Sequence, residues 1–184
     1  MTSFKFILGA VALLAVGQSA FAQEKTVTVG GAPMYPSKNI IENAVNSKDH
    51  TTLVAAVKAA GLVETLSGPG PFTVFAPTNE AFNKLPKGTV ETLLKPENKA
   101  TLAGILTYHV VAGKTSAAEL VKAIKAGGGT ATLKTVAGGS LKATLKGKKV
   151  ILTDEKGGKS TVTIADVNQS NGVIHVIDTV LMPK

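Results

Sequence analysis

One stretch near the end of the chain restricts the fold more than any other. Residues 172–181 read Gly-Val-Ile-His-Val-Ile-Asp-Thr-Val-Leu. The apolar side chains alternate into two sets that would face opposite sides of a strand: Val173, Ile177 and Leu181 in one set, and Ile174, Val176 and Val180 in the other. A strand that is apolar on both faces is normally central in its sheet. His175 and Asp178 interrupt the apolar run, so each needs a hydrogen-bond partner or an opening to solvent. We therefore expect a buried central strand over residues 173–181.

The first 22 residues have the pattern of a cleaved signal peptide. Lys5 precedes an apolar segment over residues 6–16, and Ala20-Phe-Ala22 supplies the small-x-small site that signal peptidase recognises. The apolar segment is shorter than the roughly 20 residues that span a bilayer. We expect cleavage before Gln23 and a monomeric, secreted or periplasmic product. Because cysteine is absent, the exported domain must fold without disulfides.

The remainder divides into an N-terminal arm and one domain. Residues 23–36 form the arm, which either packs on the domain through Met34 and Tyr35 or stays disordered. Residues 37–184 form the domain. Its first part, up to residue 126, has helical periodicity, and its last part alternates with period two between glycine-containing turns. This order of elements predicts an α+β fold.

Local signals fix several boundaries within this domain. Asp49 is a predicted N-cap of a helix that ends at Gly61, and Ser116 with Glu119 forms a capping box. A strand is expected over residues 72–76. Since this strand and the last one are both too apolar for a sheet edge, we expect them to lie side by side in the centre.

Charge is concentrated in the second half of the chain. Residues 23–112 hold eight lysines and seven acidic residues, whereas residues 113–184 hold eleven lysines and five acidic residues. Specific nucleic-acid binding is not expected, because the chain has no arginine for bidentate contacts and no tryptophan for base stacking. A lysine-rich surface would attract anionic polymers or surfaces through long-range charge, or it is simply a solvated face. The candidate electrostatic surface comprises Lys142, Lys146, Lys148 and Lys149.

Residue patterns for catalysis or metal binding are weak. The three histidines are His50, expected to be exposed in the first turn of a helix, His109 at a helix end, and His175 in the last strand. Their spacing gives no metal-ligand pattern, so hydrogen-bonded structural roles are favoured and no metal or other cofactor is expected. The sequence also lacks a nucleophile elbow and a phosphate-binding loop. We do not expect an enzyme.

Three separated segments resemble, in the same order, the signature segments of the fasciclin-like domain. The matching residues are Thr73, Phe75, Ala76, Pro77, Thr78 and Phe82 in the first segment, Tyr108 and His109 in the second, and Asn171, Gly172 and His175, followed by Asp178, in the third. Asn79 stands where the family often carries Asp, which changes the local charge but keeps a capping side chain. The resemblance covers nearly the whole chain after residue 39 and is closest to small, single-domain, secreted bacterial members. It implies a β-wedge, in which two β-sheets meet beside a helical layer.

The resemblance also implies a function. Family members act in adhesion and in matrix or host contact, without known catalysis, so the expected partner is a cell-surface or matrix protein or an anionic polymer. Positions similar to the contact determinants of animal members are Ile105, Leu106, Asp166 and Val167. A second hypothesis from another class is carriage of an apolar ligand, such as a carotenoid or a lipid, in a groove between helices and sheet.

Overall fold

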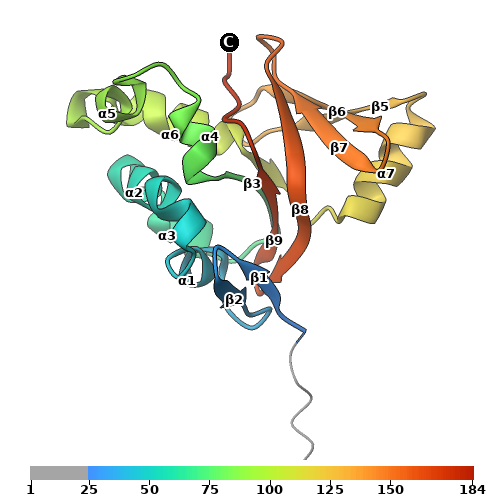
Figure 1. The fold of residues 1–184 in the computed structure, drawn as a ribbon, viewed down its shortest axis with the longest axis horizontal. Helices are drawn as coiled ribbons and strands as arrows, with labels where there is room; N and C mark the ends of the chain where they lie inside the picture. Colours follow the sequence, from blue (N-terminus) through green and yellow to red (C-terminus); the bar gives the residue numbers. More distant parts are fainter. Residues whose placement is uncertain (1–24) are drawn as a thin grey trace, which may run out of the picture.

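A curved sheet separates a layer of several helices from a single helix on its other side (Figure 1). The computed structural model describes residues 25–184, so the signal peptide predicted over residues 1–22 lies outside the described residues. In spatial order the strands of the sheet are β4 (Val110–Ala112), β3 (Phe72–Pro77), β9 (Gly172–Ile177), β8 (Lys159–Gln169), β7 (Lys149–Thr153), β6 (Ser140–Lys146) and β5 (Thr130–Lys134). Strands β3 and β9 are parallel and the other neighbours are antiparallel. An isolated bridge between Val111 and Thr135 joins the two ends of this order, so the sheet curls into the expected wedge.

Most helices lie on one side of β3 and β9 (Figure 1). This layer consists of α1 (Ile40–Ala44), the 3-10 turn η1 (Lys48–His50), α2 (Thr51–Ala60), α3 (Val63–Ser67), α4 (Asn79–Asn83), α5 (Thr89–Leu93), the 3-10 turn η2 (Pro96–Asn98) and α6 (Lys99–Tyr108). Helix α7 (Ala117–Ala126) instead packs against β5, β6 and β7. Within residues 25–184, no helix combines the length and the apolar character needed to cross a membrane.

The N-terminal arm forms a small hairpin. Strand β1 (Val27–Val29) pairs with β2 (Ala32–Met34) through a turn at Gly30 and Gly31. Val29 and Met34 are buried, whereas Tyr35 is 37% exposed. A side chain at Gly30 would collide with the backbone of Lys48, so the glycine lets the turn lie directly on η1. The arm is thus packed on the domain, through the side chain of Met34 and through the backbone of Tyr35, which exchanges two hydrogen bonds with the side chain of Asn43.

The central pair of strands divides the core into two clusters. Ile174, Val176 and Val180 pack with the helical layer and the hairpin. Ile177 and Leu181 pack on the opposite side, with Phe75, the inner face of β5–β8 and α7. This division confirms the alternation that the sequence shows, and it confirms that the first and last predicted strands are neighbours.

Two local predictions at the start of α2 were wrong. Asp49 does not cap the helix, because residues 48–50 form a 3-10 turn and α2 begins only at Thr51. The side chain that caps α2 is instead that of Asn79, the first residue of α4. Its Oδ1 accepts a hydrogen bond of 3.0 Å from the N–H of Thr52. His50 is also not exposed, because the turn directs its ring inward and leaves only 3% of the residue accessible.

The last strand is shorter than predicted, ending at Ile177 instead of Leu181. Beyond Ile177, side-chain atoms accept hydrogen bonds from backbone N–H groups that would otherwise pair with a neighbouring strand. The N–H of Thr179 donates to Oγ of Ser160 at 3.0 Å, and the N–H of Leu181 donates to Nε2 of His109 at 3.0 Å. The chain therefore leaves the sheet while Val180 and Leu181 remain buried.

Candidate functional site

The three signature segments converge at the junction between the helical layer and the sheet. Phe75 of β3 lies opposite His175 of β9 in the parallel register, and their rings stack with centroids 5.7 Å apart at 26°. Gly172 begins the same strand pair, and a side chain there would meet the carbonyl oxygen of Phe72. Phe75 also donates its backbone N–H to the carbonyl of His109, at the end of α6. The folded chain therefore brings together motif residues that are far apart in the sequence.

His175 organises the loop that leads into α7. Its Nδ1 accepts the N–H of Asp166 at 3.3 Å, and its Nε2 lies 2.8 Å from the carbonyl oxygen of Thr115. The first contact requires an unprotonated Nδ1, so Nε2 carries the proton and donates to Thr115. Burial lowers the pKa of His175, because the charged imidazolium would lose its hydration. The ring is thus a neutral bridge between strands β8 and β9 and the loop.

Asp166 and Thr73 hold the same loop from two other sides. Asp166 adopts φ = 57° at an irregularity in β8, and its Oδ1 accepts the N–H of Ala117 at 2.7 Å. Thr73 Oγ1 donates to the carbonyl of Gly113 at 2.6 Å and accepts the N–H of Thr115 at 2.9 Å. These contacts give both residues a positioning role at the start of α7.

Tyr108 and His109 connect the end of α6 to the second of the two core clusters, the one that contains Phe75, Ile177 and Leu181. The Tyr108 hydroxyl donates to the carbonyl of Ser140 at 2.8 Å and accepts the N–H of Glu155 at 3.2 Å. His109 accepts the N–H of Leu181 at Nε2, so its Nδ1 carries the proton and donates to the carbonyl of Ile105 at 2.8 Å. Burial lowers the pKa of His109 to about 4. The expected burial and hydrogen bonding of this pair are confirmed, with Tyr108 at 0% and His109 at 2% exposure.

The remaining motif residues fix the ends of helices and strands. Thr78 caps α4 by accepting the N–H of Ala81, and Pro77 closes β3 just before it. Asp178 Oδ1 accepts the N–H of Thr161 at 2.8 Å. Burial alone would raise the pKa of Asp178, but its hydrogen bonds, led by that from Thr161, outweigh burial and lower it. Phe82 is buried in the core beneath the helical layer.

Three of the four positions similar to animal contact determinants lie in the core. Ile105, Leu106 and Val167 are each no more than 5% exposed, and Asp166 is only partly exposed. A partner that binds the folded domain without rearranging it reaches Asp166 at most. Contact through these positions stays a prediction, and it requires local opening of the domain.

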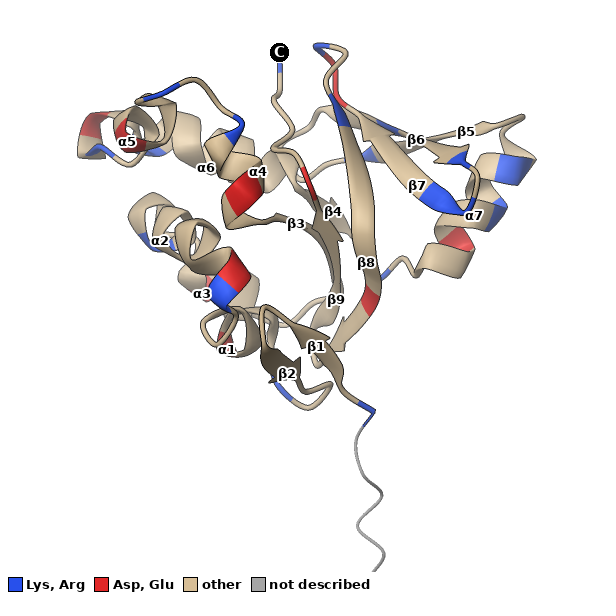
Figure 2. Ribbon diagram, in the orientation of Figure 1, with Lys and Arg blue, Asp and Glu red and all other residues tan. Residues whose placement is uncertain are grey.

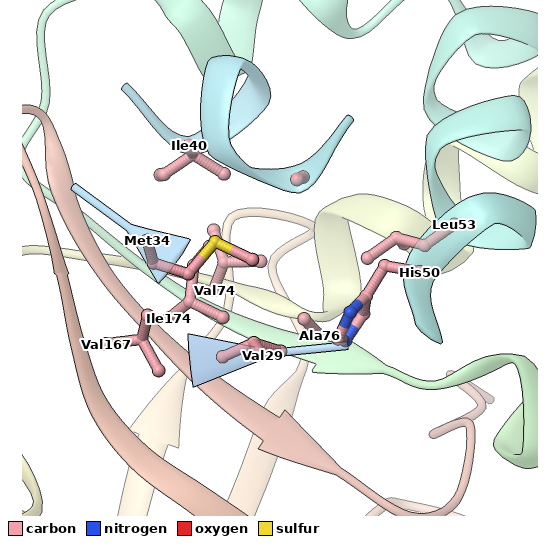
Figure 3. Close-up of a pocket in the computed structure, with 10 residues that line it drawn as sticks. Val29, Met34, Ile40, His50, Leu53, Val74, Ala76, Val167 and Ile174 are labelled. Carbon is pink, nitrogen blue, oxygen red and sulfur yellow. The ribbon is translucent and has the colours of Figure 1, made fainter. Parts of the chain in front are cut away.

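His50 lines a small apolar cavity between the hairpin, the helical layer and the sheet (Figure 3). Its Nδ1 lies 2.8 Å from Oγ of Ser47, but its buried Nε2 has no hydrogen-bond partner among the described residues. Burial lowers the pKa of His50. The cavity measures about 20 Å³, and a neighbouring cavity beneath α1 and α2 measures about 30 Å³. Small-molecule sites usually occupy about 300–1,000 Å³, so a carotenoid or lipid fits here only if the helices move away from the sheet.

The histidines do not form a metal centre in the part of the chain that the structure describes. His50, His109 and His175 belong to different elements, and no group of three or more His, Cys, Asp or Glu side chains comes together within residues 25–184. Both ring nitrogens of His109 and of His175 are already engaged by backbone groups. The arrangement suits a structural role for the signature residues.

The outward side of β5, β6, β7 and the paired part of β8 is lined by lysine and threonine, and we call it the lysine–threonine face. Its lysines are Lys134, Lys142, Lys146, Lys149 and Lys159, all exposed. Figure 2 shows lysine positions in blue along these strands. The inward side carries the second core. Lys148 lies beside the face, in the turn between β6 and β7. Within residues 25–184, none of these six ammonium groups makes an ion pair or a hydrogen bond in the structure.

Comparison with known proteins now identifies the family. Residues 48–183 match the family model of the fasciclin domain. The chain belongs to the fasciclin domain family. It is 52% identical over 160 residues to Protein sll1483 of Synechocystis sp., covering 87% of this chain and 82% of that protein. It is 40% identical over 145 residues to Immunogenic protein MPB70 of Mycobacterium bovis, covering 76% of this chain and 66% of that protein.

A solved structure shows the same fold. The FAS1 domain pair from the insect cell adhesion molecule Fasciclin I is similar with a TM-score of 0.69 and 18% sequence identity. The match covers 87% of this chain and 58% of that structure, which contains a pair of domains. The fasciclin-like fold expected from the three signature segments is therefore confirmed.

Sequence reasoning missed two features of this fasciclin domain. Asn171 holds three segments together, because its side chain accepts the N–H of Ile40 and donates to the carbonyls of Leu66 and Gly68. The family resemblance marks Asn171 as a residue of the third signature segment, but it does not reveal these three partners. The threonines between the lysines were also overlooked, although the alternation of β6, with Lys142, Thr144 and Lys146 on one side, already indicated a polar face.

Proposed function

We propose that this fasciclin domain is an exported, non-enzymatic interaction module that attaches to a cell surface, a matrix or a host surface. The lysine–threonine face is the observation that carries the proposal. It is the outer side of a four-stranded antiparallel region, and its lysines have no acidic partner on strands β5, β6 and β7. Family membership supports an adhesion-related role, since the structurally similar Fasciclin I is a cell adhesion molecule.

The physical basis of attachment is long-range charge attraction. Exposed lysines draw an anionic surface toward the domain, and salt screens this attraction beyond about 8 Å at physiological ionic strength. Side chains on the outer face contribute little to the core, so changing them alters binding and leaves the fold intact. By contrast, the signature residues are committed to internal hydrogen bonds and packing.

A surface-binding assay across a salt series tests the proposal. Binding of the mature protein to an anionic surface should weaken steeply as salt rises. The double reversal Lys142→Glu and Lys146→Glu should slow association, while the matched reversal Lys87→Glu and Lys95→Glu, at exposed positions beside α5, should change it far less. Thermal melts verify that both variants fold. Salt-insensitive binding that survives the first reversal would contradict the proposal and place the contact elsewhere.

Carriage of an apolar ligand is the second candidate function. The two apolar cavities are its specific support, because they share Ile40, Ala44, Leu53 and Val74 and lie along one interface between helices and sheet. A ligand there would have to merge and enlarge them. Native mass spectrometry of protein purified from its own cells distinguishes the functions, since a carrier retains a pigment or lipid mass and an adhesin does not.

A further inference from the structure

The lysine–threonine face is a regular grid of two kinds of polar group. Strand register places Thr132, Lys142, Thr153 and Lys159 in one row that runs across β5, β6, β7 and β8. Partners in an antiparallel pair project from the same side of a sheet. Hydroxyl and ammonium groups therefore alternate along the row. The next row, which starts with Thr130, adds Thr144 and Thr161 around the half-buried Ile151.

The groups in this grid are available to a ligand. Among the described residues, the hydroxyls of Thr130, Thr132, Thr153 and Thr161 form no hydrogen bond, and the same holds for the lysines. Adjacent strands lie about 4.8 Å apart, so Lys142 and Lys159 are separated by roughly 10 Å along the row. The grid thus presents a positive charge at every second strand, with a free hydroxyl on each strand between.

We propose that this face binds an acidic polysaccharide, which deepens the proposed function by naming the partner class. An extended acidic glycan repeats carboxylate or sulfate groups and hydroxyl groups along its length. Its anionic groups pair with the lysine ammonium groups, and its hydroxyls form hydrogen bonds with the threonine row. Beside Lys142 lies a hollow of about 430 Å³ that gives room for a sugar ring, and it is also lined by Ser140, Thr153, Asp154, Glu155, Gly157 and Lys184. The carboxylates of Asp154 and Glu155 accept the backbone N–H groups of Gly158 and Ser140.

Other polyanions and neutral glycans fit the face less well. Nucleic-acid binding to single strands relies on aromatic side chains for base stacking, and no residue of the two rows is aromatic. An anionic membrane would attract the lysines, but its phosphate oxygens only accept from the threonine hydroxyls and donate nothing in return. Neutral glycans would lack the charge attraction. The combination of free ammonium and hydroxyl groups favours a polymer that is both anionic and rich in hydroxyls.

Affinity measurements with a polyuronate test this inference. The probes are oligogalacturonate of uniform length, neutral dextran, inorganic polyphosphate, duplex DNA and anionic phospholipid vesicles. The mature protein should bind oligogalacturonate more tightly than the other four probes. Lys142→Gln with Lys159→Gln should weaken that binding about tenfold or more, because each lysine forms charge-assisted contacts. The matched pair Lys87→Gln with Lys95→Gln removes the same charge from the helical layer and should have little effect.

The hydroxyl groups are tested separately from charge. Thr132→Val with Thr153→Val keeps the shape and strand preference of both residues. It should weaken binding to oligogalacturonate several-fold and weaken binding to polyphosphate less, since polyphosphate oxygens only accept from the threonine hydroxyls whereas glycan hydroxyls both accept and donate. Equal binding to DNA or vesicles, or a valine variant that binds oligogalacturonate like the unaltered protein, would overturn the inference while leaving the proposed attachment function intact. Failure to bind any anionic probe would overturn both.

Discussion

The N–H of Asp166 points at the ring of His175 across the β8–β9 pair, and 3.3 Å separates it from the accepting Nδ1. The opposite ring nitrogen reaches Thr115, so one imidazole joins the end of the sheet to the loop before α7. The carboxylate of Asp166 then binds the first N–H of that helix. A hydrogen bond thus joins His175, a residue of the third signature segment, to Asp166, a candidate contact residue.

Replacement of His175 by Phe should destabilise the domain and loosen the start of α7. Phe keeps the ring volume, but it leaves the N–H of Asp166 and the carbonyl of Thr115 without partners, which costs about 1–3 kcal/mol. Urea denaturation measures the loss. Hydrogen exchange should accelerate selectively at residues 113–118. Ile174→Val is the control, since it perturbs the same buried strand without touching these bonds. Unchanged exchange at residues 113–118 would show that the bridge does not hold the loop.

Tyr108→Phe should lower the free energy of unfolding by about 1–3 kcal/mol, because it removes a hydroxyl with two partners in a buried position. The carbonyl of Ser140 and the N–H of Glu155 lose that partner. Tyr35→Phe is the matched control, since Tyr35 is 37% exposed and its hydroxyl has no hydrogen bond among the described residues. Chemical denaturation of both variants makes the comparison. Equal stabilities would remove the structural role assigned to the Tyr108 hydroxyl.

Position 79 should tolerate Asp better than Ala. The Asn79 side chain accepts the N–H of Thr52 and donates to the carbonyl of Lys48 at 2.8 Å. Asp keeps the acceptor and places a negative charge near the start of α2, which offsets the lost donor by about 0.3–1 kcal/mol. Ala removes both contacts and should cost about 1–2 kcal/mol, as loss of a helix cap does. Thermal melts should rank the three proteins in the order Asn, Asp, Ala, and an Ala variant as stable as the Asp variant would refute the capping role.

Periodicity and turn residues were sufficient to predict much of the fold. The two apolar faces of the last strand, the strand that begins at Phe72 and the capping box at Ser116 and Glu119 are all present as expected. These features depend on neighbouring residues, so the sequence displays them directly. The hairpin before α1 was not predicted because its strands have three residues each, too few to establish an alternation.

The errors arose where distant segments decide the outcome. His50 looked polar and exposed beside Asp49, but packing of the hairpin and of β3 against η1 encloses it. The last strand looked continuous to Leu181, but Ser160 and His109 take its final N–H groups. For the candidate site, the sequence supplied the lysines of β6, whereas their alignment with threonines on β5 and β7 follows from a register that only the paired strands reveal.

We predict that the protein is exported and that its mature form begins at Gln23. Signal peptidase recognises small residues at the positions that Ala20 and Ala22 occupy, and the chain has no cysteine to carry a lipid anchor. Intact mass spectrometry of protein recovered from outside the cytoplasm measures the mature N-terminus. A mass that retains residues 1–22, or recovery only in the membrane fraction, would contradict the prediction and the export that the proposed function requires.

Acid should destabilise the domain through His109. Burial lowers the pKa of His109 from 6.5 to about 4, and this effect outweighs the hydrogen bond to Ile105 and the attraction of Asp154, both of which raise the pKa. Between these two pH values the unfolded chain binds a proton that the folded domain excludes. Stability is therefore fully present above the unfolded pKa and falls as the pH drops toward 4. The shift corresponds to about 3 kcal/mol from this residue.

Urea denaturation at a series of pH values, for the unaltered protein and for His109→Gln, isolates this contribution. The variant should be less stable at neutral pH, because Gln does not fill the space of the ring, but its stability should fall less steeply on acidification. Burial also lowers the pKa of His50 and His175, so some acid sensitivity should remain in the variant. Parallel pH curves for the two proteins would mean that His109 gains no proton when the domain unfolds. The single neutral tautomer assigned from its contacts with Ile105 and Leu181 would then be wrong.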